Sequence, residues 1–176
     1  MASNPAVQAN AQPGVRPGVR PGVRLALDVQ RASAATELPG DALLRRWARA
    51  ALADIGGNHE LTVRIVDAPE SAALNAEYRH KQGPTNVLSF PFEVPPGVSS
   101  RLLGDLVLCA DVVQREAHEQ GKSPQAHWAH MIVHGVLHLR GFDHLTTVEA
   151  QAMETHETEI LARLGFPNPY EFHEDL

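Results

Sequence analysis

Four histidines stand at helical spacing in one stretch of the chain: His127, His130, His134 and His138. At 100° per residue, steps of three and four residues place all four on one face of a helix. A histidine pair four residues apart, such as His134 and His138, can bind one metal ion from that face. His144 follows after Gly141, and a glycine at a helix end lets the chain turn back. The sequence therefore predicts a metal site made of His134, His138 and His144.

The expected chemistry of this site is catalytic. Three neutral imidazoles with one open position are typical of a catalytic zinc site, whereas a fourth protein ligand usually closes a structural one. The single cysteine, Cys109, lies in a predicted strand. We expect one Zn²⁺ ion with three histidine ligands and a water whose pKa falls to about 7, although three imidazoles also suit nickel, copper or iron. His127 and His130 are expected to pack or to support the ligands.

The spacing of the three histidines is also that of the metzincin peptidases. Those enzymes carry a glutamate directly after the first histidine, where it serves as general base. Here that position holds Gly135. No other residue stands out as a protein base, so metal-bound water is the expected nucleophile. A metal-dependent peptidase or amidase remains an alternative that Gly135 disfavours.

The elements that position the histidines follow from hydrophobic periodicity. Strands are predicted at residues 25–30, 61–66, 86–90 and 103–110, and helices at 41–52, 71–80, 111–120, 123–140 and 147–164. This order indicates a single α/β or α+β domain, with a mixed sheet of about four strands packed with about five helices. The continuously apolar strand at 103–110 is expected inside the sheet. The metal site then falls on a central helix and the turn after it.

The 176 residues suit one domain, expected over residues 25–170. Residues 1–24 contain Pro-Gly-Val-Arg three times and predict a disordered extension, or alternatively an RNA-binding arm through Arg16, Arg20 and Arg24. Residues 171–176 form an acidic tail. The net charge of -6 lies in residues 145–176, with seven acidic residues and one basic residue, because residues 1–144 hold 14 of each. We expect the last helix to present this charge to solvent, away from the cleft.

Composition excludes several classes of protein. No apolar run approaches the roughly 18 residues needed to span a bilayer, and the first residues contain no signal-peptide core. One cysteine permits no intramolecular disulfide, so a reducing, cytoplasmic location is expected. The acidic balance argues against a protein that coats nucleic acid by bulk charge.

The sequence HGVLHLRGFDH at residues 134–144 resembles the signature of the YbeY family of bacterial metal-dependent endoribonucleases. Further segments resemble the family in the same order: residues 61–75, 78–81, 84–91, 103–106 and 126–130. The resemblance implies a zinc-type metal on the three histidines and a catalytic role for Arg79 near the metal cleft. It also implies single-stranded RNA as substrate, maturation of the 3′ end of 16S rRNA, ribosome quality control, and the ribosome with its assembly proteins as partners. It implies neither membrane nor DNA binding.

Arg79 suits this chemistry, because a planar, permanently charged guanidinium can neutralise a phosphodiester in the transition state. Alternatively it is a solvated charge at a helix end. Residues 84–91 line the cleft as an edge strand or form an ordinary strand, and Asp143 orients an imidazole or caps the turn. A ribosome-assembly factor that uses the ion only for shape is the remaining, non-catalytic alternative.

Overall fold

A computed structural model describes residues 22–171 of the chain. The Pro-Gly-Val-Arg copies up to residue 21 and the acidic tail from residue 172 lie outside this range. Within it, the elements are β1 (Val23–Ala32), α1 (Asp41–Ala50), β2 (Gly57–Val66), α2 (Ala68–Arg79), β3 (Val87–Pro91), β4 (Leu102–Cys109), α3 (Ala110–Glu119), α4 (Pro124–Leu139) and α5 (Thr147–Arg163). Their order is the predicted one.

The four strands form one mixed sheet in the order β1-β2-β4-β3. β1, β2 and β4 run parallel, whereas β3 pairs antiparallel with β4 and forms an edge. The apolar strand β4 lies inside the sheet, as predicted, and residues 106–109 are buried. β1 begins at Val23, paired with Gly57, so the strand starts two residues before the predicted start of the domain.

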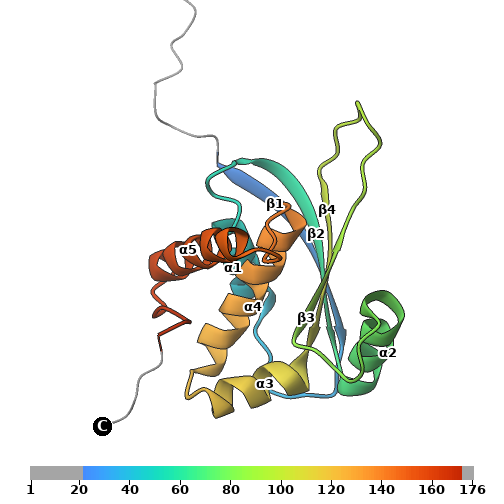
Figure 1. The fold of residues 1–176 in the computed structure, drawn as a ribbon, viewed down its shortest axis with the longest axis vertical. Helices are drawn as coiled ribbons and strands as arrows, with labels where there is room; N and C mark the ends of the chain where they lie inside the picture. Colours follow the sequence, from blue (N-terminus) through green and yellow to red (C-terminus); the bar gives the residue numbers. More distant parts are fainter. Residues whose placement is uncertain (1–21, 172–176) are drawn as a thin grey trace, which may run out of the picture.

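The helices cover the two faces of the sheet unequally. α1, α4 and α5 lie on one face, and α2 lies on the other (Figure 1). Between the sheet and the first group lies the main core, to which Trp47, Ile65 and Ile132 contribute. A small separate cluster of Val66, Leu88 and Val107 packs under α2. α4 is therefore the central helix of the larger layer, because it packs against the sheet, α1 and α5, while α1 also packs against β1.

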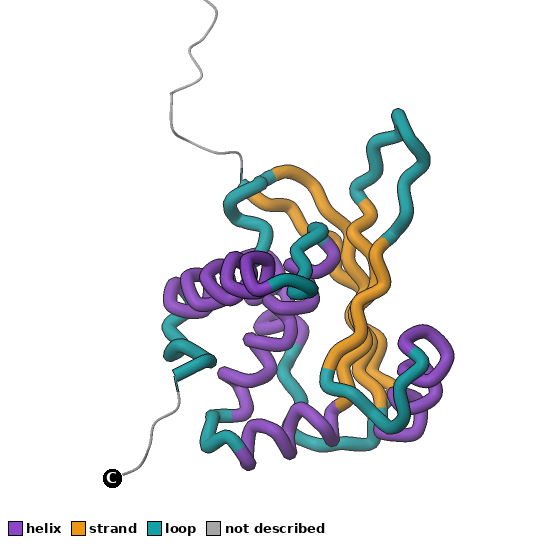
Figure 2. Tube along the Cα trace, viewed as in Figure 1, coloured by secondary structure: helices purple, strands orange, loops and turns teal. Residues whose placement is uncertain are grey.

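The connection between β3 and β4 projects beyond the rest of the domain (Figure 2). Residues 92–101 of this connection are exposed throughout. No helix within the described range is long and apolar enough to cross a membrane.

Candidate metal centre

α4 is a buried helix that fixes the direction of its histidines. Ser123 caps its first turn by accepting a hydrogen bond from the backbone N–H of Ala126 at 3.1 Å. Pro124 occupies the first helical position, where its missing N–H costs nothing. Most side chains of α4 are buried. Because the helix is held on several sides, its histidine stripe cannot rotate away from the position that packing imposes.

The turn after α4 returns the chain toward the helix. The N–H of Gly141 bonds to the carbonyl of His138, and the N–H of Phe142 bonds to that of Leu137, both at 3.0 Å. Gly141 has a φ of +97°, which a side chain would disfavour. The Asp143 carboxylate accepts from the backbone N–H of His144 at 2.8 Å and lies 3.9 Å from its Nδ1. Asp143 thus caps the turn and also lies beside the imidazole.

The three predicted ligands come together at the end of α4. The Nε2 atoms of His134 and His138 lie 3.1 Å apart, and one ligand nitrogen from each of the three histidines lies within 4.8 Å of the others. His134 and His138 are half-buried, whereas His144 is exposed. The cluster is therefore open to solvent on the side of His144.

The chemistry of the donors fits a metal ion. Burial, followed by the neighbouring imidazoles of His134 and His144, lowers the pKa of His138 to about 4. His138 is therefore neutral at neutral pH, which is the form that binds metals. A backbone hydrogen bond to Phe142 also engages this side chain. The three-histidine cluster can hold a metal ion and leave a coordination position for solvent or substrate.

A buried glutamate that the sequence interpretation missed fixes the first ligand. The Glu157 Oε1 lies 2.5 Å from Nδ1 of His134, so this nitrogen carries the proton and Nε2 is left free for a metal. The Glu157 Oε2 accepts from Nε2 of His130 at 2.9 Å and from the hydroxyl of Tyr170. Burial alone would raise the pKa of Glu157, but the hydrogen bonds with His130 and His134 outweigh it and lower the pKa to about 2.

The expectation that the last helix presents its acidic residues to solvent is wrong for Glu157, whose exposed fraction is 0%. Counting charge along the chain hid the periodicity that could have identified it. The buried residues of α5 follow one another at steps of four, three and one: Met153, Glu157, Ile160 and Leu161. A carboxylate inside such an apolar stripe needs a partner, and the histidines of α4 supply it.

His127 and His130 do not join the ligand cluster. His130 holds Glu157, as described above. His127 is buried and donates from Nε2 to Oε1 of Glu116 at 3.2 Å, while Asn86 donates to the same carboxylate at 3.0 Å. The His127 hydrogen bond is the main reason why the pKa of Glu116 is lowered. Both histidines therefore serve the packing around α4, in agreement with the expectation from their spacing.

Gly135 points away from the metal cluster. A Cβ atom at this position would lie 2.7 Å from Cδ2 of Leu106, a fully buried residue of β4. A larger residue here would therefore force the Leu106 side chain to shift within the core. A side chain at position 135 would meet the core rather than a substrate, which removes the position from which a metzincin base would act.

Arg79 is the last residue of α2, on the face of the sheet opposite α4 (Figure 1). Its side chain is exposed and makes no hydrogen bond or ion pair with another residue in the described part of the chain. The neighbouring Tyr78 packs edge-to-face against Phe90 of β3, with ring centroids 5.1 Å apart. Arg79 thus lies near the edge strand, and its catalytic role stays a prediction. Ser89 of β3 donates to the carbonyl of Gly135 at 3.4 Å, so the same strand adjoins α4.

The fold and the histidine cluster together define a class: single-domain α/β proteins with an open cluster of three histidines, able to hold a metal ion, at the end of a buried helix. Comparison with known proteins is more specific. The model of the family described as Endoribonuclease YbeY matches residues 30–165. The Endoribonuclease YbeY of Methylococcus capsulatus is 59% identical over 144 residues, which cover 82% of this chain and 94% of the relative. The chain belongs to the YbeY family of endoribonucleases, hydrolases that act on the phosphodiester bonds of RNA.

The family and enzyme class predicted from residues 134–144 are thereby confirmed. Among solved structures, a protein from Thermotoga maritima matches with a TM-score of 0.49 and 21% identity, over 81% of this chain and 99% of that chain. This likeness is too remote to bear on the fold or the activity.

Proposed function

We propose that the chain is a metal-dependent endoribonuclease specific for single-stranded RNA, which matures the 3′ end of 16S rRNA and takes part in ribosome quality control. The ribosome and its assembly proteins are the proposed partners, and the cytoplasm is the proposed location. One observation supports the catalytic part above all others: three imidazole nitrogens meet at an open position beside an edge strand. The choice of RNA comes from the family.

We propose zinc as the ion. Two nitrogens bound to one tetrahedral zinc lie about 3.3 Å apart, given Zn–N bonds of about 2.05 Å. The 3.1 Å between the Nε2 atoms of His134 and His138 is close to this value. When bound, zinc supplies a Lewis acid that activates water and stabilises charge on a phosphoryl oxygen.

The side chains around the site have separate tasks in this proposal. Glu157 holds the proton of His134 on Nδ1 and thereby orients the ligand. β3 offers the unpaired backbone groups of a sheet edge to an extended substrate. Arg79 supplies the cation that pairs with a phosphate of the bound chain.

The test uses zinc-loaded protein with a single-stranded RNA, a duplex RNA and an unstructured peptide. We expect cleavage of the single strand only. Replacing His134, His138 or His144 with alanine should abolish both metal binding and cleavage. Arg79→Ala should slow cleavage while zinc affinity stays unchanged. Cleavage of the peptide alone would refute the proposal in favour of a peptidase.

The non-catalytic alternative makes a different prediction for the same variants. Histidine variants that lose the metal and yet restore rRNA maturation in a deletion strain would show that the ion is not needed for chemistry. We expect no such restoration, because the solvent-open side of the cluster serves no purpose in a purely structural site.

A further inference from the structure

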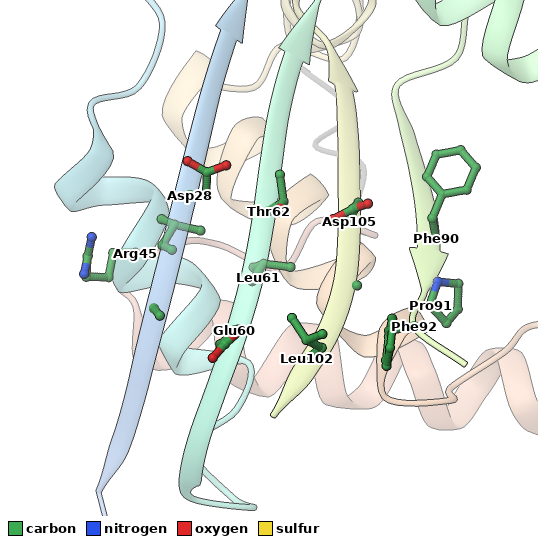
Figure 3. A pocket seen from close by; sticks show the side chains of 13 residues that line it. Asp28, Arg45, Glu60, Leu61, Thr62, Phe90, Pro91, Phe92, Leu102 and Asp105 are labelled. Carbon is green, nitrogen blue, oxygen red and sulfur yellow. The ribbon is translucent and has the colours of Figure 1, made fainter. Parts of the chain in front are cut away.

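One face of the sheet contains a hollow of about 660 Å³ on the side opposite α4 (Figure 3). A row of four side chains crosses it, because Asp28 is paired with Thr62, Thr62 with Asp105, and Asp105 with Phe90. Strand alternation points all four out of the main core. α2 covers the carboxyl ends of the parallel strands but leaves this part of the face without a helix.

The hollow combines negative charge with exposed apolar surface. Its lining contains three carboxylates, those of Asp28, Glu60 and Asp105, and one guanidinium, that of Arg45 on α1, so the lining carries a net negative charge. Neither Glu60 nor Asp105 makes a side-chain hydrogen bond or ion pair with another residue of the described range. Phe92 and Leu102 line the same hollow with exposed fractions of 48% and 43%. Phosphates would be repelled here, so the surface fits a basic and partly apolar peptide rather than RNA.

We propose that the occupant is the segment at residues 13–21 of the same chain. This segment contains two complete copies of Pro-Gly-Val-Arg and the proline of a third. Arg16 and Arg20 match the carboxylates in charge, and the valines and prolines match the apolar wall. Each proline fixes one backbone angle, so less conformational freedom is lost when the segment binds in an extended form. Docking in the hollow would explain the charge, the composition and the position of this repeat together. The catalytic site explains none of them.

The segment is attached at the correct end of the hollow. It leads through Gly22 into β1, whose residues Ala26 and Asp28 form one side of the hollow. Asp28 lies five residues beyond Val23, about 17 Å along a strand. Arg16 lies six residues before Gly22, about 19 Å along an extended proline-rich chain. A reversal at Gly22, where an added Cβ atom would meet no other atom within 4 Å, brings Arg16 level with Asp28.

The docking would have a consequence for the rest of the molecule. It would withdraw Arg16 and Arg20 from RNA and would cover the open sheet face until a competing basic partner displaced the segment. This contrasts with the alternative in which the same arginines form an arm for RNA. The proposal does not depend on the catalytic activity, so it can fail while the proposed function stands.

The test is paramagnetic broadening in the full-length protein. Cys109 has an exposed fraction of 0%, so a cysteine introduced by Ala11→Cys can be labelled selectively with a nitroxide. We expect the amide signals of Thr62 and Asp105 to be attenuated, while that of Glu159 on α5 is unchanged. The double variant Arg16→Glu, Arg20→Glu should restore the signals. The matched control, Arg46→Glu with Arg163→Glu, has the same change in net charge at exposed helix positions and should leave the attenuation intact.

Three outcomes would overturn the proposal. The first is an absence of attenuation, or attenuation that appears only after a single-stranded RNA is added. The second is attenuation that persists in the double variant, because the pairing of charges would then be wrong. The third is attenuation that rises with protein concentration, because the occupant would then be the segment of a second copy.

Discussion

The substitution Glu157→Gln tests whether the charge and the two acceptor oxygens of the buried carboxylate matter, because it leaves the volume of the side chain almost unchanged. Glutamine keeps the shape of the side chain but replaces one oxygen with an NH₂ group. If the remaining oxygen faces His134, the NH₂ group opposes two donors, the Nε2–H of His130 and the hydroxyl of Tyr170. If instead the remaining oxygen faces His130 and Tyr170, the NH₂ group opposes the Nδ1–H of His134. That histidine must then move its proton to Nε2, the nitrogen that faces the metal.

Both arrangements carry a cost that can be estimated. A buried donor without an acceptor costs about 1–3 kcal/mol. Loss of a carboxylate that orients a metal-binding histidine typically lowers metal affinity by about 10–100-fold, or about 1.4–2.7 kcal/mol. We therefore expect Glu157→Gln to bind zinc roughly 10–100-fold more weakly and to melt several degrees lower, at about 2–4 °C per kcal/mol.

The assay is competition for zinc against a colorimetric chelator, with thermal melting of the metal-free protein followed by circular dichroism. Glu159→Gln is the matched control, because it removes the same charge from the exposed face of the same helix. Tyr170→Phe removes one donor to Glu157 and leaves the hydrogen bond between Glu157 and His134 in place, although it also removes the 3.3 Å contact between the hydroxyl and Nε2 of His130. It keeps the test usable if Glu157→Gln folds poorly. A folded Glu157→Gln protein with zinc affinity within roughly twofold of wild type would show that Glu157 is structural only.

Three further predictions concern positions in the same layer. Gly141→Ala and Gly165→Ala should each cost about 1–2 kcal/mol in chemical denaturation, because both have positive φ at a helix end, but only Gly141→Ala should weaken zinc binding. Gly135→Ala should destabilise the fold by about 1–3 kcal/mol, because its Cβ would meet Leu106; an unchanged denaturation midpoint would contradict this packing. Glu116 has a lowered pKa, so its contribution to stability is present above its ordinary pKa of 4.5 and is lost as the pH falls below it. Glu116→Gln should therefore lose less stability than wild type in urea titrations as the pH falls below 4.5.

The parts of the site that the sequence predicted are those that depend on local geometry. Helical spacing puts His134 and His138 on one face, and the conformation of Gly141 returns the chain so that His144 meets them. The order of strands and helices along the chain also limits the possible topologies of the sheet. The apolar sequence of β4 correctly predicted that this strand lies inside the sheet rather than at an edge.

The parts that were missed depend on contacts between distant segments. Glu157 lies 23 residues from His134 in sequence, and Tyr170 lies 13 residues beyond Glu157. The motif at residues 134–144 gives no indication that Glu157 or Tyr170 lies near its histidines. Counting the acidic residues of the last helix also led to a wrong expectation for Glu157, because a count treats every acidic side chain of a helix as equally exposed. Because α5 packs against α4, one of these acids, Glu157, is buried, and it hydrogen-bonds His134.

The proposed role of Arg79, taken with its placement, would limit how RNA can bind. The histidines and Arg79 lie on opposite faces of the sheet, and β3 is the edge that adjoins both α4 and the end of α2. The acidic hollow lies beside Phe90 on the face of Arg79, so a phosphate chain is disfavoured there beyond the edge. A substrate that contacts both Arg79 and the histidines must therefore bend around β3. A single strand can bend in this way because its backbone is flexible, whereas a stiff duplex cannot follow an edge one strand wide. The proposed preference for single-stranded RNA thus follows from the topology of the sheet, provided that Arg79 contacts the bound chain.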